Sequence, residues 1–490
     1  MRIVLPNQIE TALSILINNG YEAYIVGGCV RDILLGKIPK DYDITTNALP
    51  QQIITLFKNY HIIDKGLKHG TVTVIIDGMP IEITTYRIDG KYSDNRHPDN
   101  VNFTGNLKED LKRRDFTINA IAYNHNHGIV DYFGGRFDIE KRIIKCVGEP
   151  DRRFGEDALR ILRALRFSAE LNFTIEENTA RSIHKNKELL RNIAVERIAG
   201  EFSMILCAEG AESVVYEFTD VFGVFIPEIV HMKNFYKTNN SCKMKNTYQD
   251  KTPKKCDMYG TCETCDLLTH ALKVVNNVPK DLRLKLAAFF HDIGKPFTGS
   301  SDQWERKCIC EWEGEPKYFH KYEQCFNENE CFSEHAKKSS EIAKDILIRL
   351  KYDNNTIDKV TKLILYHDIT FENDERILKR WLNKLSEKVM QDIIVLKKAH
   401  VLGQGFQDHC KLKQLDEIND TIDKIITQKQ CFLLKDLAVN GHDLIKLGIP
   451  ESKSLGQILN HLLFQVIDGN LPNEKEALLK AAFDLYKNIQ

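Results

Sequence analysis

Two aspartates stand one residue apart in the N-terminal part of the chain, Asp41 and Asp43, and apolar Tyr42 and Ile44 alternate with them. On a strand, side chains alternate between the two faces, so the two carboxylates would point the same way. Two carboxylates crowded on one face repel each other unless a cation lies between them. Oxygen ligands of this kind suit Mg²⁺, which also holds substrate phosphates. The pair therefore predicts catalytic residues that bind magnesium.

Two adjacent glycines precede the aspartates and close an apolar run at residues 24–26. Because they lack side chains, Gly27 and Gly28 would let backbone N–H groups approach a triphosphate closely. Arg31, on the helix-like segment that follows, could neutralise the phosphate charge. With the aspartates, these residues predict a metal-dependent nucleotidyl-transfer site.

A third acid is predicted from a hairpin around Asp77 and Gly78, a dipeptide typical of tight hairpin turns. On the second strand Glu82 faces away from Ile81 and Ile83, so it is a candidate third carboxylate at the magnesium site. The alternative, a solvated strand glutamate, fits the spacing equally well.

Basic residues follow the hairpin. Arg113 and Arg114 precede Asp115 at the expected start of a helix, where two arginines can bind phosphate or ribose. The alternative is a surface cluster of salt bridges, which is what such a triplet more often forms.

A long helix is expected to start within residues 154–167, with a core stripe of leucines. An acid in its first turn would complement the helix dipole, and Glu156 could pair with Arg160 four residues later. This structural role explains one acid and one arginine. It does not explain three arginines at three-residue spacing, Arg160, Arg163 and Arg166.

Composition limits the classes of function. The 490 residues suggest two to four domains. Lys and Arg total 68 against 69 for Asp and Glu, so nucleic-acid binding would need local basic patches instead of a global positive field. No signal-peptide pattern and no apolar run of about 20 residues is present, so a soluble cytoplasmic protein is expected.

These motifs together resemble the class II tRNA nucleotidyltransferase and bacterial poly(A) polymerase family, and they occur in the family's order. The resemblance covers roughly residues 20–205, and similarity of pattern continues to the C-terminus. It rests on Gly27-Gly28-x-Val30-Arg31-Asp32 with Asp41-x-Asp43, on Arg113-Arg114-Asp115, on the segment at Asp131, on Glu156-Asp157-x-x-Arg160-x-x-Arg163, and on Glu196-Arg197.

The resemblance implies how a base would be selected. Cytosine and adenine both present an amino donor beside a ring-nitrogen acceptor, which one carboxylate and one guanidinium complement. Asp157 and Arg160 would be this protein template for CTP and ATP. Two Mg²⁺ ions would lie at Asp41 and Asp43, one activating the 3′-hydroxyl and one stabilising the pyrophosphate. The nucleotide-binding residues that the resemblance implies are Gly27, Gly28, Arg31, Arg114, Asp115, Asn119, Glu156, Asp157, Arg160, Arg163 and Arg166.

Two kinds of family member make different RNA products. Poly(A) polymerases usually carry a basic C-terminal extension, whereas this chain is neutral, and its segments 66–74 and 439–459 resemble the tRNA enzymes. We therefore expect addition of 3′-terminal CCA to tRNA from CTP and ATP, with contacts to the acceptor stem and elbow. Addition of only CC or only A, and poly(A) synthesis, stay open as alternatives.

A second constellation of histidines and aspartates lies downstream and resembles the HD metal-phosphohydrolase superfamily. Imidazole and carboxylate together suit a divalent transition metal with open positions for water and phosphate. The resemblance implies a second activity, as a phosphodiesterase or phosphatase acting on 2′,3′-cyclic phosphate or similar ends. A lone histidine on an apolar helix would more often be a core residue. The residues are His270, His291, Asp292, His335, His367 and Asp368.

Eight of the thirteen cysteines fall between Cys242 and Cys331, which marks two inserts in this region. Cys262 and Cys265 form a Cys-x-x-Cys, which could close a tetrahedral Zn²⁺ site with Cys242 and Cys256. Reduced thiols in a tolerant loop and an iron–sulfur cluster are the alternatives.

The expected fold is α+β, with a polymerase β-like nucleotidyltransferase head, built from a mixed sheet with helices, followed by an all-helical neck, an HD-type body and a tail. The expected domains are residues 1–145 for the head, 146–210 for the neck with the base-recognition helix, 211–400 for the body with its two Cys-rich inserts, and 401–490 for a tail that contacts tRNA. Two other function classes stay open. One is a binding or sensor protein with relic metal sites, and the other is an HD hydrolase whose head recruits RNA.

Overall fold

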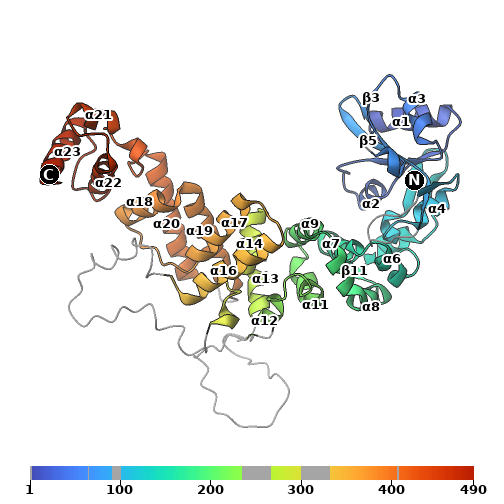
Figure 1. Ribbon diagram of the computed structural model, residues 1–490. Coiled ribbons are helices and arrows are strands. Elements are labelled where there is room, and N and C mark those ends of the chain that lie inside the picture. Colours follow the sequence, from blue (N-terminus) through green and yellow to red (C-terminus); the bar gives the residue numbers. More distant parts are fainter. Residues whose placement is uncertain are drawn as a thin grey trace, which may run out of the picture. The chain divides into compact units, whose positions relative to one another are not determined.

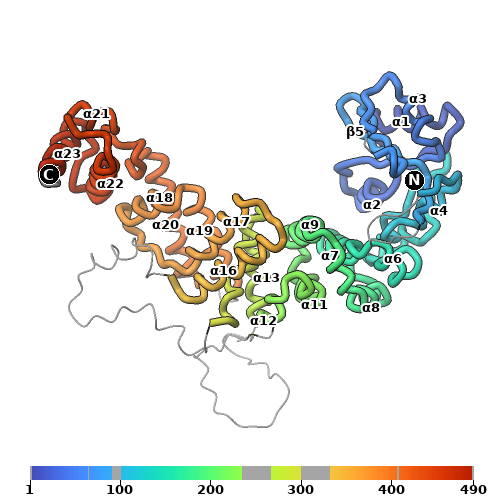
Figure 2. Tube along the Cα trace, in the orientation of Figure 1, coloured from blue at the N-terminus to red at the C-terminus, as the bar shows by residue number. Residues whose placement is uncertain are grey.

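The computed structural model describes residues 3–64, 66–90, 101–233, 235, 266–298, 332–404 and 408–489. The chain divides into two compact units, one running to Val230 together with residues 349–351, and one containing the remaining residues from His231 onward. Figure 1 colours the first unit from blue to green and the second from yellow-green to red, and Figure 2 follows the same path along the Cα atoms. Within the described residues, no helix is long and apolar enough to cross a membrane.

A seven-stranded mixed sheet forms the N-terminal part of the first unit, in the order β3-β4-β5-β2-β1-β8-β9. Strands β2 and β5 are parallel, and every other neighbouring pair is antiparallel. Two small sheets pair β6 with β7 and β10 with β11. The strands are β1 (Ala23–Val26), β2 (Asp43–Thr46), β3 (His61–Ile63), β4 (Thr71–Ile76), β5 (Met79–Thr85), β6 (Arg87–Asp89), β7 (Val101–Phe103), β8 (Ile121–Asn124), β9 (Gly128–Asp131), β10 (Ile143–Ile144) and β11 (Thr174–Ile175).

The hairpin of β4 and β5 turns at Asp77 and Gly78, as the sequence predicts. Both residues have positive φ, 47° and 80°, which a two-residue hairpin turn requires. Helix α3 (Pro50–Leu56) packs against both strands, and α1 (Asn7–Asn18) packs against β1, as Figure 1 shows for this corner of the unit. Apolar side chains of the strands are buried, and the polar side chains between them are left at the surface.

Helices complete the first unit, so the α+β class is confirmed. Helices α2 (Gly28–Leu34), α4 (Leu107–Lys112) and α5 (Gly135–Lys141) contact the sheet or the segments that connect its strands. The helices that follow β10 pack mainly on one another. The helices not yet given are α6 (Pro150–Glu156), α7 (Leu159–Leu171), α8 (Glu177–Asn186), α9 (Val195–Leu206), α10 (Ala211–Glu217), α11 (Thr219–Phe222) and α12 (Ile229–Lys233), with 3-10 helices η1 (Leu67–His69), η2 (Thr117–Asn119) and η3 (Lys187–Asn192).

Two expectations about helices are wrong. The single helix expected through residues 154–167 is two helices, because Asp157 takes an extended conformation (φ −137°, ψ 105°) between α6 and α7. Its Oδ1 accepts a hydrogen bond from the N–H of Leu159 (3.1 Å), a local bond that competes with helix continuation. Arg113 lies at the C-terminal end of α4, where we expected the start of a helix.

The second unit is helical throughout its described part. Helix α13 packs against α14 and α19, and α14 also packs against α17. Apolar residues of the last three helices form a separate core at the C-terminal end. The helices are α13 (Leu267–Asn277), α14 (Leu282–Phe290), α16 (Glu334–Arg349), α17 (Asn354–Tyr366), α18 (Glu375–Leu385), α19 (Glu387–Gly403), α20 (His409–Thr427), α21 (Gly441–Lys446), α22 (Lys453–Ile467) and α23 (Lys475–Ile489), with η4 (Lys295–Phe297) and η6 (Leu434–Asp436). The finer division at residues 145, 210 and 400 stays a prediction.

Candidate functional site

The acid cluster consists of Asp41, Asp43 and Glu82, whose side chains are all exposed. Asp43 is the first residue of β2, and the parallel register places it opposite Glu82 of β5, while Asp41 precedes the strand. Loss of hydration is the main reason why the pKa of Asp43 rises to about 6. The positive charge of Arg114 opposes this rise, and the negative charges of Glu82 and Asp41 add to it. The three carboxylates are therefore close enough to repel one another.

This donor set fits a divalent cation. The three side chains offer hard oxygen ligands that are open to solvent. The repulsion among them, which adds to the raised pKa of Asp43, is relieved when a cation lies among them. Asp41, Asp43 and Glu82 thus have the chemistry that the sequence predicts for a magnesium site.

A glycine makes room for Arg114 beside the acid cluster. Gly27 has φ +82° and precedes α2, and a Cβ there would lie 3.0 Å from Nη1 of Arg114. Any other residue would be strained by this backbone conformation and would press on the guanidinium. Gly28, the other predicted glycine, is the first residue of α2.

A chain of hydrogen bonds joins four predicted nucleotide-binding residues. Nη1 of Arg31 donates to Oδ1 of Asn119 (2.9 Å), and Nδ2 of Asn119 donates to Oδ1 of Asp115 (3.2 Å). Arg163 donates to Oδ2 of Asp115 from Nη2 (2.6 Å) and Nε (2.9 Å). Burial opposes the ionisation of Asp115, but the charge and hydrogen bonds of Arg163 prevail and lower its pKa to about 2.

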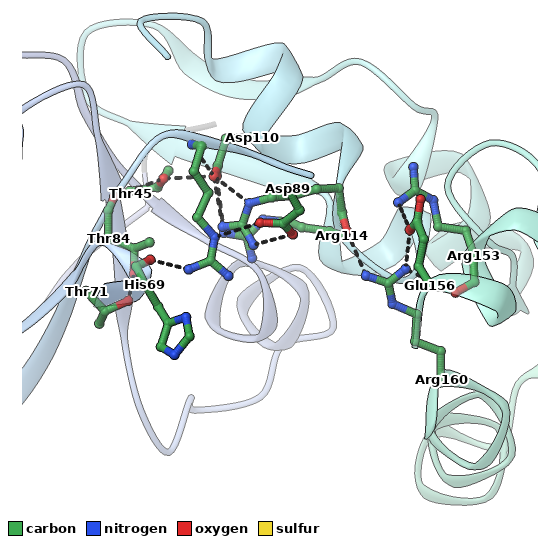
Figure 3. Close-up of polar contacts among 12 residues, drawn as sticks. Thr45, His69, Thr71, Thr84, Asp89, Asp110, Arg114, Arg153, Glu156 and Arg160 are labelled. Atoms are coloured by element: carbon green, nitrogen blue, oxygen red, sulfur yellow. Dashed lines mark hydrogen bonds and ion pairs between the residues drawn. The ribbon is translucent and has the colours of Figure 1, made fainter. Parts of the chain in front are cut away.

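Asp110 is fully buried and ties both arginines of the Arg-Arg-Asp motif to the sheet, as Figure 3 shows. Its Oδ2 accepts from the hydroxyl of Thr45 in β2 (3.0 Å) and lies 3.6 Å from Nη2 of Arg114. Its Oδ1 accepts from Nη2 and Nε of Arg113 (2.8 and 3.0 Å). The two arginines are therefore part of a buried ionic network, and the alternative of a surface cluster does not hold.

Arg160 is held in one orientation by its surroundings. Nη1 donates to Oε2 of Glu156 (2.8 Å), the expected pair four residues apart, and to the backbone carbonyl of Arg153 (3.2 Å). Nη2 donates to the backbone carbonyl of Arg113 (3.1 Å), as Figure 3 shows. Only 8% of Arg160 is exposed. Such a guanidinium is held in a fixed direction.

Asp157 lies at the break between α6 and α7, three residues before Arg160. Its Oδ1 is used by the N–H of Leu159, and its Oδ2 lies 3.4 Å from Nη2 of Arg197, the third residue of α9. The sequence placed Arg197 in the Glu196-Arg197 motif but gave it no role in the site. The Glu196-Arg197 motif was the feature of the sequence that could have indicated this role of Arg197.

The dipeptide Arg113-Arg114 connects the acid cluster with the Asp157–Arg160 pair. The side chain of Arg114 acts on Asp43, and the backbone carbonyl of Arg113 accepts from Arg160. The two groups of residues, which are far apart in the sequence, therefore belong to one region of the first unit.

Arg166 pairs with a buried glutamate and lies over an aromatic ring. Its Nε lies 2.8 Å from Oε2 of Glu201, which is buried. The guanidinium carbons of Arg31, Arg163 and Arg166 lie 5.1, 5.3 and 4.4 Å from the ring centroid of Phe167. Each of the three arginines also has an acidic partner, so their positive charges are compensated within the protein.

A second polar cluster lies in the second unit. The histidine cluster comprises Asp292, which is fully buried, and five histidines around it. Burial opposes ionisation of Asp292, but its pKa is held well below the usual range by His291 and Lys295. Burial lowers the pKa of His335 to about 4 and that of His400 well below its usual range, so both rings are neutral at pH 7. The members are His270, His291, Asp292, His335, His367 and His400.

The structure brings the predicted histidines of this cluster together around Asp292. The His291-Asp292 and His367-Asp368 pairs follow the last residues of α14 and α17. Asp368 is about half exposed, and its Oδ2 lies 3.8 Å from Nε2 of His335.

His400 was missed. It lies in the apolar helix α19, more than thirty residues after the last predicted member of the cluster, and its ring centroid lies 5.0 Å from that of His270. No spacing in the sequence distinguishes it from a core histidine. The cysteines of the predicted zinc site, Cys242, Cys256, Cys262 and Cys265, lie outside the described residues.

Three family models match the chain. The Poly A polymerase head domain matches residues 23–145, and tRNA nucleotidyltransferase domain 2 matches residues 330–482. A model described as "Probable RNA and SrmB-binding site of polymerase A" matches residues 172–231.

Relatives with a known name match less than half of the chain. A CCA-adding enzyme of Lactobacillus johnsonii is 50% identical over 219 residues, which are 44% of this chain and 54% of that protein. A CCA-adding enzyme of Geobacillus thermodenitrificans is 51% identical over 188 residues, 38% of this chain and 46% of that protein. The matched part spans about half the length of these relatives.

Solved structures match along the whole chain. The Bacillus stearothermophilus CCA-adding enzyme in complex with CTP has a TM-score of 0.67 and 25% identity and covers 99% of both chains. The Thermotoga maritima CCA-adding enzyme complexed with tRNA has a TM-score of 0.57 and 20% identity, over 98% of this chain and 96% of that one. At 20% identity, the similarity to the Thermotoga maritima enzyme shows a shared fold alone.

The buried pair of Asp115 and Arg163 predicts a stability effect. In an Asp115→Asn variant, Arg163 loses its counter-charge inside the protein, so we expect the free energy of unfolding at pH 7 to fall by about 3 kcal/mol. Because folding lowers the pKa of Asp115 to about 2, its contribution is complete above its ordinary pKa and is lost as the pH falls toward 2. Urea unfolding of both proteins across this pH range measures the difference.

The matched control is Glu188→Gln, which removes the acid of an exposed pair with Arg191. We expect a change below about 1 kcal/mol for this variant. Equal losses in the two variants, or a difference at Asp115 that does not shrink in acid, would contradict the assigned role of this pair.

Proposed function

Because the chain belongs to the family of class II tRNA nucleotidyltransferases and bacterial poly(A) polymerases, we propose that it adds the 3′-terminal CCA to tRNA from CTP and ATP without a nucleic-acid template. The relatives named CCA-adding enzyme support this proposal for the part of the chain that they match. The observation that carries it is the dipeptide Arg113-Arg114: the charge of Arg114 acts on Asp43 of the acid cluster, and the backbone carbonyl of Arg113 accepts a hydrogen bond from Arg160. One nucleotide could place its triphosphate at the acid cluster and its base at Arg160.

The acid cluster would hold the catalytic magnesium. Asp41 and Asp43 are the proposed ligands, with Glu82 as the third carboxylate beside them. When bound, Mg²⁺ supplies positive charge that favours ionisation of the attacking hydroxyl and stabilises the leaving pyrophosphate. In the reaction, the 3′-oxygen of the RNA bonds to the α-phosphorus, the bond to pyrophosphate breaks, and the hydroxyl proton is lost.

Arginines near the acid cluster would bind the triphosphate and ribose. Gly27 and Gly28 let the backbone approach the phosphates, and Arg114 stands next to Asp43. Arg31 is positioned by Asn119, which Asp115 holds in turn. Arg163 and Arg166 are farther along α7, and their acidic partners orient them toward the same ring of Phe167.

The Asp157–Arg160 pair would select the base. The carboxylate of Asp157 accepts from an exocyclic amino group, and a guanidinium N–H of Arg160 donates to a ring nitrogen, an arrangement that both cytosine and adenine satisfy. Uracil and guanine present a carbonyl beside an N–H, so each polar group would meet its like and remain unpaired. Glu156 and the carbonyl of Arg113 keep Arg160 in place, and Arg197 keeps Asp157 in place.

The remaining partners follow from this proposal. The tRNA acceptor stem and elbow would contact the helices after the head, including the C-terminal tail. A cytoplasmic location suits a tRNA substrate and stays a prediction, as does zinc at the cysteines.

The acid cluster can be tested by its variants. We expect Asp41→Ala and Asp43→Ala to lower extension of a tRNA transcript that lacks CCA by at least about 10³-fold, since each removes a metal ligand. Binding of the tRNA should remain. Extension with each of the four labelled nucleoside triphosphates measures rate and product together.

The matched control is Asp77→Asn, at the hairpin turn, where asparagine tolerates the positive φ. It should extend tRNA at the normal rate. Full extension by the Asp41 and Asp43 variants would contradict the proposal. Products that stop at CC, products with A alone, or long A tails from the unaltered protein would favour the corresponding alternative reaction.

A second function is favoured by the histidine cluster, where five imidazoles and one ionised carboxylate meet. We propose that it binds a divalent transition metal and hydrolyses phosphate esters such as 2′,3′-cyclic ends. Two of its groups have no hydrogen bond within the described residues, Nε2 of His291 and Oδ1 of Asp292, which fits atoms left for a metal. In hydrolysis, the oxygen of water bonds to phosphorus, a P–O ester bond breaks, and the leaving oxygen takes a proton.

We expect a His291→Ala, Asp292→Ala double variant to lose hydrolysis of 2′,3′-cyclic nucleotides and of nitrophenyl phosphate esters, because the metal could no longer be held. Its extension of tRNA should be unchanged. The control is His461→Ala, an exposed histidine of α22 in the same unit. Hydrolysis at the same level in the double variant, or no hydrolysis by the unaltered protein with any divalent metal, would contradict this second function.

A further inference from the structure

Phe167 of α7 is almost fully buried and has three arginines around its ring. Only 5% of the residue is exposed. The guanidinium carbons of Arg166, Arg31 and Arg163 lie 4.4, 5.1 and 5.3 Å from the ring centroid. All three distances are within the range of about 6 Å over which an aromatic face attracts a cation. Three positive charges therefore share one uncharged side chain.

The three arginines come from two helices that are far apart in the sequence. Arg31 belongs to α2, the helix that follows Gly27 and contacts strands β1 and β8 of the sheet. Arg163 and Arg166 belong to α7, as does Arg160. The ring thus joins the helix of the proposed triphosphate-binding arginine to the helix of the proposed base-selecting arginine.

The polar partners of Arg31 leave a role for this ring. Oδ1 of Asp32 accepts from Nε and Nη2 of Arg31 (2.9 and 2.8 Å), but Asp32 is the next residue on α2 and cannot fix Arg31 relative to α7. A link to Arg163 runs through Asn119 and Asp115, by hydrogen bonds that need both of these side chains in place. The ring contacts the arginines of both helices directly.

The ring of Phe167 is itself held in place. Phe116, which is fully buried, packs edge-on against it, with ring centroids 5.7 Å apart and planes at 83°. Only 11% of the Arg31 side chain and 14% of the Arg166 side chain are exposed, and the attraction between an aromatic face and a cation is stronger when the cation has lost water. An aliphatic side chain could fill this space, but it would not attract the guanidinium groups.

We propose that Phe167 is a positioning residue for the nucleotide, whose ring holds Arg31 toward the triphosphate and at a constant distance from α7. This inference rests on the triphosphate-binding role proposed above for Arg31, and it adds a residue that itself touches neither phosphate nor base. The ring carries no charge and donates no hydrogen bond, so it acts through the arginines alone. Because Arg31 is already oriented before a nucleotide arrives, less ordering is needed on binding.

Progressive fluorination of the ring tests the proposal directly. Fluorine withdraws electron density from the face of the ring and weakens its attraction for cations stepwise, while the size and apolar character of the side chain change little. Phenylalanine and its mono-, di- and trifluoro forms are inserted in place of Phe167 in the full-length protein by the same suppressor tRNA. Equilibrium dialysis of the protein without substrate tRNA gives the Kd for CTP and for ATP, and extension of tRNA that lacks CCA gives KM and kcat.

We expect Kd and KM for both nucleotides to rise with each fluorine, to about 10-fold for the trifluoro form. The value of kcat should change by less than about twofold, because binding is lost equally in the ground state and in the transition state. The preference for CTP and ATP over UTP and GTP should remain, since Arg160 is not altered.

The matched control is the same fluorination series at Phe57, a fully buried phenylalanine of the first unit that packs against Tyr60. Kd, KM and kcat should stay constant along that series. The Phe167→Leu variant, which removes the ring, should raise Kd and KM at least as much as the trifluoro form does. If Phe167→Leu fails to fold, the fluorinated proteins decide.

The proposal is overturned if Kd is constant along the series at Phe167, if the series at Phe57 gives an equal rise, or if kcat falls while KM stays constant. A stepwise fall of the melting temperature without nucleotide, combined with a constant Kd, would show that the ring stabilises the fold only and would also overturn it. These outcomes leave the proposed CCA addition intact as long as the unaltered protein extends tRNA. Failure of the unaltered protein to extend tRNA would refute that reaction instead, and the Kd series would still test the role of the ring.

Discussion

The guanidinium of Arg160 is the most constrained group in the first unit. It is almost fully buried, and it donates to Glu156 and to the backbone carbonyls of Arg153 and Arg113. An arginine side chain keeps its proton in proteins, so the positive charge and the orientation of this guanidinium are fixed. In the binding mode proposed above, Arg113 and Arg114 would fix the place of the base relative to that of the triphosphate, because Arg114 acts on Asp43 and the carbonyl of Arg113 accepts from Arg160. The proposed selection of a nucleotide and its reaction would then depend on one short segment.

That segment is itself anchored by burial. Asp110 accepts hydrogen bonds from Arg113 and Thr45, which joins α4 to β2, the strand that carries Asp43. Buried ion pairs contribute little net stability, but removing one partner is costly. A network of this kind therefore holds the arginines in one arrangement, and a substitution that removes one of its members destabilises the protein. Asp115 extends it toward Arg163 and Asn119.

The features of the fold and of the candidate site that depend on local rules could be predicted from the sequence. The Asp77-Gly78 turn, the opposition of Glu82 to the apolar face of β5, and the pair of Glu156 and Arg160 follow from periods of two and of about four residues. The break at Asp157 could not be predicted, because a single carboxylate bond to the N–H of Leu159 outweighs helix propensity there. Asp110 and His400 were missed for another reason: their partners Thr45 and His270 are far away in the sequence. Arg197 was marked by the Glu196-Arg197 motif, but that motif does not indicate its contact with Asp157.

The second unit illustrates the same limit. The histidines near residues 291 and 367 could be recognised because each is followed directly by an aspartate, whereas His400 has only apolar and basic neighbours. Burial then changes what these groups can do. It keeps His335 and His400 neutral, whereas the charges of His291 and Lys295 lower the pKa of Asp292 against the effect of burial. An ionised carboxylate is the protonation state that a metal ligand needs.

The central claim is that the Asp157–Arg160 pair chooses the nucleotide, and base discrimination by Arg160→Lys and Asp157→Asn variants tests it most directly. Lysine keeps the charge but loses the fixed pair of donors, and asparagine offers both a donor and an acceptor. Preference for CTP and ATP over UTP and GTP in tRNA extension should fall by about 10- to 100-fold. Arg152→Lys, whose residue also pairs with Glu156 but is exposed, should keep the preference. An equal loss of rate for all four nucleotides, with the preference intact, would contradict the account.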